Sequence, residues 1–271
     1  MPTVADLRRR SAPDDPLTML TAYDTPTARV VDEAGVDAIL VGDSMGNAVL
    51  GYETTLPVTV EDVASRTGAV VRGVEDAVVV ADLPFLSYGA DRATTVENAG
   101  RMVKEAGADA VKIESGPHTV GLTNDLVDLG IPVMAHLGLT PQHVNELGGY
   151  ARQGTTRDDA AALLELARDH ADAGAFALVL EHVPSNVAAQ VTEAIDVPTI
   201  GIGAGPDCDG QVLVINDVVG LSERMPPFAH QFGDVRSEMA DAVSAYLRAV
   251  EGGEFPAPEH HERDPDLDDV A

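Results

Sequence analysis

One pattern constrains the fold of this chain more than any other: short apolar runs of strand length recur, and each ends in a polar side chain. Apolar runs bounded by turn residues are typical of strands buried on both faces, as parallel strands are. The carboxyl ends of parallel strands meet at one edge of a sheet, so we expect these polar side chains on a common rim. The runs end at Asp43 with Ser44, at Asp82, at Lys112 with Glu114, at His136 and at Glu181.

Helical segments alternate with these runs. Seven strand signals are clear, whereas an eighth, 212–219, is compatible with a strand, a short helix or parts of both. Alternation favours a parallel sheet with right-handed crossovers. A chain of 271 residues fits a single-domain α/β protein with a (β/α)8 TIM barrel better than an open doubly wound sheet. We expect a peripheral N-terminal segment at 1–16, the barrel at 17–255, and a disordered acidic tail at 256–271.

The acidic excess is the most unusual feature of the composition. The chain has 45 Asp and Glu against 17 Lys and Arg, a net charge of −28, and only two lysines, Lys104 and Lys112. Such a surface repels phosphate backbones and anionic lipid, which argues against nucleic-acid and membrane partners. We interpret it as adaptation to a halophilic interior, because the Debye length falls to about 3 Å at 1 M salt. Genomic codon bias competes as an explanation for the few lysines, but not for the acidic excess.

The sequence also bears on the compartment. No apolar run approaches the ~18 residues of a membrane helix and we find no secretory leader, so we expect a cytoplasmic protein. Cys208 is the only cysteine, which excludes an intrachain disulfide and a cysteine-based metal cluster within one chain.

Four carboxylates on one rim, with Lys112 as the only fixed cation among them, need a compensating charge. Two carboxylates ~4 Å apart repel by about 4 kcal/mol at an effective dielectric constant of ~20. All-oxygen ligands with open positions favour Mg²⁺ over Ca²⁺. An open metal face can chelate a 2-oxo acid and stabilise the enolate formed when a neighbouring proton leaves. Glu181 is the candidate base because it is not itself a ligand.

Each of these side chains also has an ordinary structural interpretation. Asp43 and Asp82 are suited to cap the helices that follow them, and Lys112 is compatible with a surface position. Glu181 alone fits a strand-end salt bridge, and His136 alone fits a hydrogen-bonded core histidine. The combination of all of them, rather than any single residue, favours a functional site.

The segments that follow the strands form a specific combination of motifs. They are 41–44, 81–85, 111–114, 136–142, 148–150, 180–181, and 201–205 followed by 209–211. Through them the chain, from about residue 19 to residue 260, resembles the ketopantoate hydroxymethyltransferase family, which catalyses the first committed step of pantothenate synthesis. The glycine-rich segment 201–205 is the weakest of these signals, because it also fits a phosphate cradle, a folate-facing loop or close packing.

The resemblance implies a (β/α)8 barrel with one Mg²⁺ per subunit. Asp43 and Asp82 would ligate the ion and also face the substrate, and Glu114 would support the ion, through water. With open positions left to water or substrate, this ligand set would suit chelation of a 2-oxo acid.

The resemblance also implies a reaction. Ser44 and Lys112 would hold 3-methyl-2-oxobutanoate, His136 would line the same pocket, and Glu181 would remove the proton. The resulting enolate would attack the one-carbon unit of 5,10-methylenetetrahydrofolate, giving 2-dehydropantoate and tetrahydrofolate. The family further implies a homo-oligomer, a decamer.

Two other functions stay open on the residues alone. A Mg²⁺-dependent carbon–carbon lyase of the phosphoenolpyruvate mutase or isocitrate lyase type would share the barrel and the acidic rim, but the chain lacks a Lys-Lys-Cys-Gly-His motif. A non-enzymatic, salt-adapted binding scaffold would leave the clustered carboxylates unexplained.

Overall fold

The computed structural model describes residues 2–10 and 15–265 and divides into two compact units. Unit 1 extends to Ile215 and includes Pro226–Ala229, and unit 2 comprises Asn216–Met225 and the chain from His230 onward. Each unit is described separately below.

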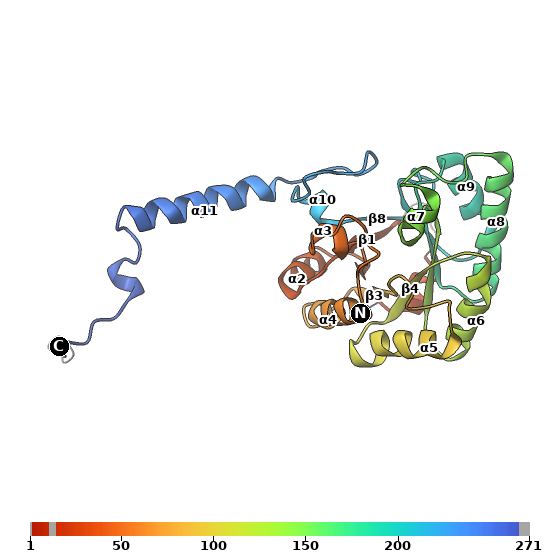
Figure 1. Ribbon diagram of the computed structural model, residues 1–271, viewed down its shortest axis with the longest axis horizontal. Coiled ribbons are helices and arrows are strands. Elements are labelled where there is room, and N and C mark those ends of the chain that lie inside the picture. Colours follow the sequence, from red (N-terminus) through yellow and green to blue (C-terminus); the bar gives the residue numbers. More distant parts are fainter. Residues whose placement is uncertain (1, 11–14, 266–271) are drawn as a thin grey trace. The chain divides into compact units, whose positions relative to one another are not determined.

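Unit 1 is a closed barrel of eight parallel strands (Figure 1). Each strand pairs with its neighbours in chain order, and the last strand pairs with the first. The strands are β1 (Leu17–Thr21), β2 (Ala38–Val41), β3 (Val78–Asp82), β4 (Ala110–Glu114), β5 (Val133–Gly138), β6 (Ala177–Glu181), β7 (Thr199–Ile202) and β8 (Gly210–Leu213). The (β/α)8 prediction is confirmed, and the ambiguous segment 212–219 holds the end of β8 followed by a short helix, α10 (Ile215–Val218).

Helices follow the strands of unit 1 and cover them from outside (Figure 1). They are α2 (Thr25–Glu33), α3 (Met45–Ala48), α4 (Val60–Val71), α5 (Arg92–Gly100), α6 (Val120–Asp128), α7 (Val144–Leu147), α8 (Arg157–Asp172) and α9 (Ser185–Ala194), with short turns η1 (Arg101–Glu105), η2 (Pro117–Thr119) and η3 (Pro141–His143). A further short helix, α1 (Val4–Leu7), precedes β1. Their start signals are local: Thr59 and Asp62 form a reciprocal capping box at α4. Helix α5 is continued by a π-helical turn, η1.

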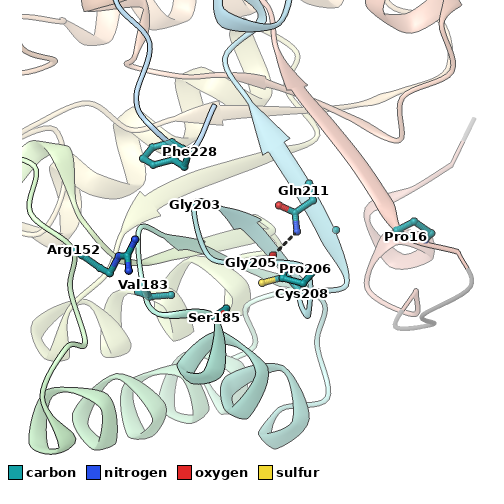
Figure 2. A pocket seen from close by; sticks show the side chains of 11 residues that line it. Pro16, Arg152, Val183, Ser185, Gly203, Gly205, Pro206, Cys208, Gln211 and Phe228 are labelled. Carbon is teal, nitrogen blue, oxygen red and sulfur yellow. Dashed lines mark hydrogen bonds between the residues drawn. The ribbon is translucent and has the colours of Figure 1, made fainter. Parts of the chain in front are cut away.

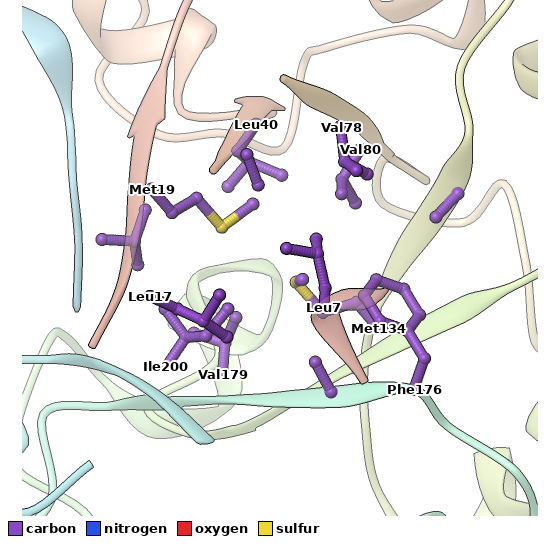
Figure 3. Close-up of a cluster of buried hydrophobic side chains, with 14 residues drawn as sticks. Leu7, Leu17, Met19, Leu40, Val78, Val80, Met134, Phe176, Val179 and Ile200 are labelled. Atoms are coloured by element: carbon purple, nitrogen blue, oxygen red, sulfur yellow. The ribbon is translucent and has the colours of Figure 1, made fainter. Parts of the chain in front are cut away.

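The inside of the barrel is a packed apolar core (Figure 3). Alternate strand residues such as Met19, Leu40, Val80 and Met134 point inward and are almost fully buried. Leu7 of the N-terminal segment belongs to the same cluster and is 2% exposed. This segment therefore contributes a core side chain, a feature that its polar composition does not reveal. The core leaves the barrel no pore, so polar chemistry is confined to the strand ends.

Unit 2 contains α11 (Val235–Glu251), which begins after Asp234, whose side chain accepts a hydrogen bond from Ser237 N. A short turn, η4 (Pro258–His260), follows within the acidic tail, and residues 266–271 of that tail lie outside the described residues. The domain bounds expected from the sequence stay a prediction. Among the helices that the structure describes, none is long and apolar enough to cross a membrane.

Candidate active site

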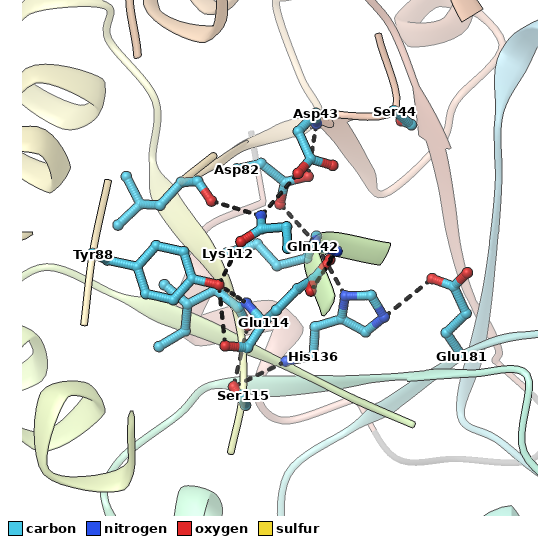
Figure 4. Close-up of polar contacts among 12 residues, drawn as sticks. Asp43, Ser44, Asp82, Tyr88, Lys112, Glu114, Ser115, His136, Gln142 and Glu181 are labelled. Atoms are coloured by element: carbon cyan, nitrogen blue, oxygen red, sulfur yellow. Dashed lines mark hydrogen bonds and ion pairs between the residues drawn. The ribbon is translucent and has the colours of Figure 1, made fainter. Parts of the chain in front are cut away.

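Parallel register gathers the predicted site residues at the carboxyl ends of β2 to β6 (Figure 4). Asp82 stands opposite Lys112, and Glu114 opposite His136. Glu181 stands opposite Gly138, at the end of β5. The rim expected from the sequence is thus present, although the roles of its residues remain to be tested.

Lys112 and Asp82 form a buried ion pair, with 2.7 Å between Nζ and Oδ1. Asp82 also accepts a hydrogen bond from Asp43 N at 2.9 Å, which ties the end of β3 to the loop after β2. Burial opposes the charge of Lys112, but Asp82, Asp43 and Glu114 outweigh that effect and raise the pKa of Lys112 to about 12. The lysine is therefore protonated at neutral pH.

The positive charge of Lys112 does not balance the negative charges of Asp43, Asp82 and Glu114, as the pKa of Asp43 shows. Burial, together with the charges of Asp82 and Glu114, raises the pKa of Asp43 well above its ordinary value, against the opposing effect of Lys112. All three carboxylates are at most 5% exposed, so water does little to screen their repulsion. The cluster therefore favours an additional cation or a bound proton.

Gln142 links these carboxylates, a role that the sequence did not reveal. Its backbone N–H donates to both carboxylate oxygens of Glu114, at 3.1 and 3.0 Å, and its Nε2 donates to Asp43 Oδ2 at 2.8 Å. Tyr88 donates its hydroxyl proton to Gln142 Oε1 at 2.8 Å. Gln142 was noted only as part of a motif, and nothing in the sequence marks Tyr88, because loop positions become neighbours only in the folded chain.

A second contact series runs from Lys112 to the predicted base. Lys112 Nζ lies 3.3 Å from His136 Nδ1, and His136 Nε2 lies 3.1 Å from Glu181 Oε2. Because the ammonium can only donate, Nδ1 must accept, and neutral His136 then carries its proton on Nε2. That proton faces the Glu181 carboxylate. The Glu181 side chain is 16% exposed, more than any other carboxylate of the cluster.

Ser44 lies just beyond Asp43, before α3, and its hydroxyl is 2.9 Å from the hydroxyl of Tyr23. Burial raises the pKa of Tyr23 to about 12, with further contributions from Asp82 and Asp43. Tyr23 is thus a neutral phenol that orients the Ser44 hydroxyl at the edge of the site.

Two of the predicted metal ligands fit a hard cation better than the third. Asp82 Oδ1 is buried and has the Lys112 ammonium at 2.7 Å as its side-chain partner, and Asp43 lies next to Asp82 with an unbalanced charge. Carboxylate oxygens of this kind suit Mg²⁺. Glu114, in contrast, is held by Gln142 N through both of its oxygens.

The full set of three carboxylate ligands is not assembled. Over residues 2–10 and 15–265, no three His, Cys, Asp or Glu side chains stand close enough together to hold a metal ion. Direct coordination by Asp43, Asp82 and Glu114 together is therefore not what the geometry favours. The arrangement fits two direct carboxylate ligands, with Glu114 acting at longer range.

The glycine-rich segment after β7 borders a separate cavity of about 650 Å³ (Figure 2). A Cβ on Gly205 would lie 2.4 Å from Ser185 Cβ, and one on Gly203 would lie 2.7 Å from the Phe228 ring. Of the three sequence interpretations of this segment, close packing therefore has direct support. The cavity itself is lined by Arg152, Val183 and Cys208 among others.

Comparison with known families and proteins identifies relatives of the chain. A family model described as ketopantoate hydroxymethyltransferase matches residues 2–258. A protein of Halobacterium salinarum named 3-methyl-2-oxobutanoate hydroxymethyltransferase is 70% identical, with 100% of both chains covered. A protein of the same name from Haloarcula marismortui is 65% identical, again over 100% of both chains.

Solved structures with the same fold are more distant. A phosphoenolpyruvate phosphomutase from Streptomyces platensis subsp. rosaceus has a TM-score of 0.61 at 18% identity, covering 97% of this chain and 92% of that one. A phosphonopyruvate hydrolase in complex with oxalate and Mg²⁺ has a TM-score of 0.59 at 12% identity, covering 95% and 93%. At these identities the similarity supports a shared fold and says nothing about function.

Proposed function

The chain belongs to the ketopantoate hydroxymethyltransferase family and is a transferase, and we propose that it moves a hydroxymethyl group from 5,10-methylenetetrahydrofolate to 3-methyl-2-oxobutanoate, giving 2-dehydropantoate. One observation carries this proposal: the buried Lys112–Asp82 pair and its neighbouring carboxylates lie beside a glutamate that faces a histidine N–H. This combination suits removal of a proton next to a carbonyl.

Mg²⁺ is the cofactor that this site suits best. Asp43 and Asp82 would hold it, and Glu114 would support it through water, because the Glu114 carboxylate is already engaged by Gln142 N. Bound there, the ion would stabilise the negative charge that develops on the keto oxygen as the proton leaves.

Lys112 and Ser44 would seat the 2-oxo acid. Lys112 is charged and is held in place by Asp82, so it provides a fixed positive potential for the anionic substrate. Ser44 has its hydroxyl oriented by Tyr23 and can donate or accept one hydrogen bond. Together they would hold the substrate with its C3–H toward Glu181.

Glu181 would act as the base. The C3 proton would move to the Glu181 carboxylate, while His136 Nε2–H, 3.1 Å from Oε2, keeps that carboxylate oriented. The C3 electron pair would then form the bond to the one-carbon unit of the folate. Both carbon–nitrogen bonds to that unit, at N5 and N10, break, and water supplies the oxygen of the hydroxymethyl group. The proton taken from C3 and one proton of that water end on the two folate nitrogens, which gives tetrahydrofolate.

A Mg²⁺-dependent lyase of the phosphoenolpyruvate mutase or isocitrate lyase type is the alternative function. The likeness to the phosphomutase, at 18% identity, supports the fold and not the reaction. Relatives up to 70% identical are named for hydroxymethyl transfer, which is why we favour that reaction.

Deuterium exchange tests the proposal. We expect the wild-type protein with Mg²⁺ to exchange the C3 proton of 3-methyl-2-oxobutanoate in D₂O without folate, and to form product when folate is added, both followed by NMR. Replacing the base, Glu181→Gln, should slow exchange roughly 10²–10⁴-fold. Glu193→Gln, an exposed position on α9, is the matched control and should exchange like wild type.

Each outcome is decisive. Exchange retained in Glu181→Gln would mean that another group is the base, and a wild-type protein that neither exchanges nor forms product would overturn the reaction itself.

The charge of the chain supports adaptation to salt. A net charge of −28 destabilises the compact state by self-repulsion unless ions screen it. We expect the melting temperature to rise steadily between 0.1 and about 2 M KCl, where the Debye length shrinks from about 10 Å to below 3 Å. A melting temperature independent of KCl would refute this. The homo-oligomer expected from the family is a further proposal, tested by sedimentation in the same salt series.

A further inference from the structure

We propose that Gln142 is a positioning residue that sets the orientation of Asp43 and Glu114, and thereby the Mg²⁺ affinity of the site. This inference rests on the proposed function, because it assumes that Asp43 takes part in binding the ion. It goes beyond that function because the residue that orients the metal-binding carboxylates is a neutral loop residue that would touch neither metal nor substrate.

The amide of Gln142 has only one workable orientation. Its Nε2 donates to Asp43 Oδ2 at 2.8 Å and to the Leu83 carbonyl at 3.0 Å, so both amide protons are used. Its Oε1 accepts the Tyr88 hydroxyl proton at 2.8 Å. A flipped amide would point oxygen at two acceptors, which is strongly unfavourable in a site where Gln142 is 5% exposed.

Tyr88 fixes that amide from behind. Its hydroxyl accepts from Glu114 N at 3.0 Å while donating to Gln142 Oε1 (Figure 4). Glu114, at the end of β4, therefore fixes the Tyr88 hydroxyl, and Tyr88 fixes the orientation of the Gln142 amide.

The backbone of the same residue acts on Glu114. Gln142 N, in η3, donates to both Glu114 oxygens. One residue thus holds Glu114 with its main chain and Asp43 with its side chain. It engages only Oδ2 of Asp43, so that Oδ1 of Asp43 is outside these hydrogen bonds, as a direct ligand needs to be.

The loop that carries Gln142 is itself fixed beside the base. Leu139 N donates to the Glu181 carbonyl at 2.8 Å, and this close approach requires glycine at position 138. Gly138 has φ of 95°, and a Cβ there would lie 2.3 Å from Glu181 O. The contact with the end of β6 therefore fixes the loop that carries Gln142. Gln142 in turn orients Glu114 through its backbone N–H and Asp43 through its side chain.

The test is Mg²⁺ binding, measured by calorimetry on the full-length protein, with Mg²⁺ alone as the probe. Gln142→Met keeps the volume and removes the donor, and should weaken Mg²⁺ binding about 10–100-fold, as loss of a group that orients a ligand does. Tyr88→Phe should weaken it less, because the Gln142 amide remains. Gln153→Met is the matched control: its side chain bonds only the Ala151 carbonyl on the same loop, and Mg²⁺ affinity should be unchanged.

If Gln142 positions the metal ligands, we expect a second result that a purely structural role would not give. The exchange rate of Gln142→Met should recover most of the wild-type value at saturating Mg²⁺, because the base, Glu181, is not affected directly. Wild-type Mg²⁺ affinity in Gln142→Met, or a rate that Mg²⁺ does not restore, would overturn the inference.

Two further outcomes distinguish a variant that does not fold, and a failure of the proposed function, from a failure of this inference. If Gln142→Met does not fold, Tyr88→Phe decides: reduced Mg²⁺ affinity supports the inference and unchanged affinity overturns it. If the wild-type protein itself binds no Mg²⁺, the proposed function fails at its metal, and this inference fails with it.

Discussion

The two halves of the barrel rim differ in how their polar groups are held. At the ends of β2 to β4, Asp43, Asp82, Lys112 and Glu114 are buried and joined by hydrogen bonds and an ion pair. From β5 onward, Glu181 is more exposed, with His136 as its one charged or polar side-chain partner among the described residues, and a cavity of about 650 Å³ opens along β6 to β8.

This difference shows how one rim can serve two steps, the binding of a cation and the removal of a proton. A cluster of like charges must be fixed before a cation binds, since rearranging buried charges is costly, and the first half shows this fixing. A base must reach a substrate and release it, so it needs access. The second half provides that access by having few contacts and adjacent space.

The largest effect should come from the ion pair of the first half. Asp82→Asn leaves Lys112 buried without its nearest counter-charge and removes a proposed ligand. We expect Mg²⁺ binding to be lost in calorimetry, and C3 exchange to fall by about 10²–10³-fold. Thermal unfolding should also show a lower melting temperature, because breaking a buried pair costs roughly 3–5 kcal/mol. Normal Mg²⁺ affinity in this variant would remove Asp82 from the proposed metal site.

An intermediate effect should separate the halves. His136→Leu removes the N–H that faces Glu181, at a cost of roughly 1.5–3 kcal/mol for a hydrogen bond to a charged group, or about 10–100-fold in exchange rate. Mg²⁺ affinity should change little, because the contact of His136 toward the proposed ligand Asp82 runs through Lys112. If exchange and Mg²⁺ affinity fell together, the two halves would act as one unit and the comparison would fail.

A stability effect should follow from Asp43. Its pKa in the folded protein is raised, by burial first and then by Asp82 and Glu114, so the folded state favours the protonated form. Stability from this group is therefore highest below its unfolded pKa and declines as pH rises toward its folded pKa.

Asp43→Asn should then raise the melting temperature of the Mg²⁺-free protein by a few degrees at pH 7 and have less effect at pH 4, while abolishing Mg²⁺ binding. Calorimetric unfolding at both pH values checks this. A destabilised variant at pH 7 would mean that Asp43 is compensated without metal.

The smallest effect should come from the open half. Arg152 is exposed and lines the cavity beside β6. If this half admits the anionic folate, Arg152→Ala should raise the KM for folate several-fold, through loss of a surface charge contact, and leave C3 exchange without folate unchanged. Steady-state kinetics at varied folate provides the measurement. An unchanged KM would indicate that folate approaches from elsewhere.

Some of this organisation could be predicted from sequence because it depends on local pattern. Apolar runs fixed the strands, and parallel register then made neighbours of Asp82 and Lys112, and of Glu114 and His136. The eighth strand was ambiguous because the segment 212–219 contains the end of β8 and, directly after it, the short helix α10.

The rest depends on tertiary contacts that no local signal encodes. Leu7 enters the core from a polar segment, and Tyr88 and Gln142 meet although they lie 54 positions apart in the chain. The orientation of Glu114 toward Gln142 N follows from the path of the loop after β5, which Gly138 permits. Motifs located Gln142 without revealing its function.

A crystal structure of the protein with Mg²⁺ and 3-methyl-2-oxobutanoate would test the central claim most directly. We predict one ion about 2.0–2.1 Å from carboxylate oxygens of Asp43 and Asp82, with Glu114 separated from it by water, and the Glu181 carboxylate facing C3 of the substrate. An ion bound elsewhere, or a substrate whose C3 lies out of reach of Glu181, would contradict the account.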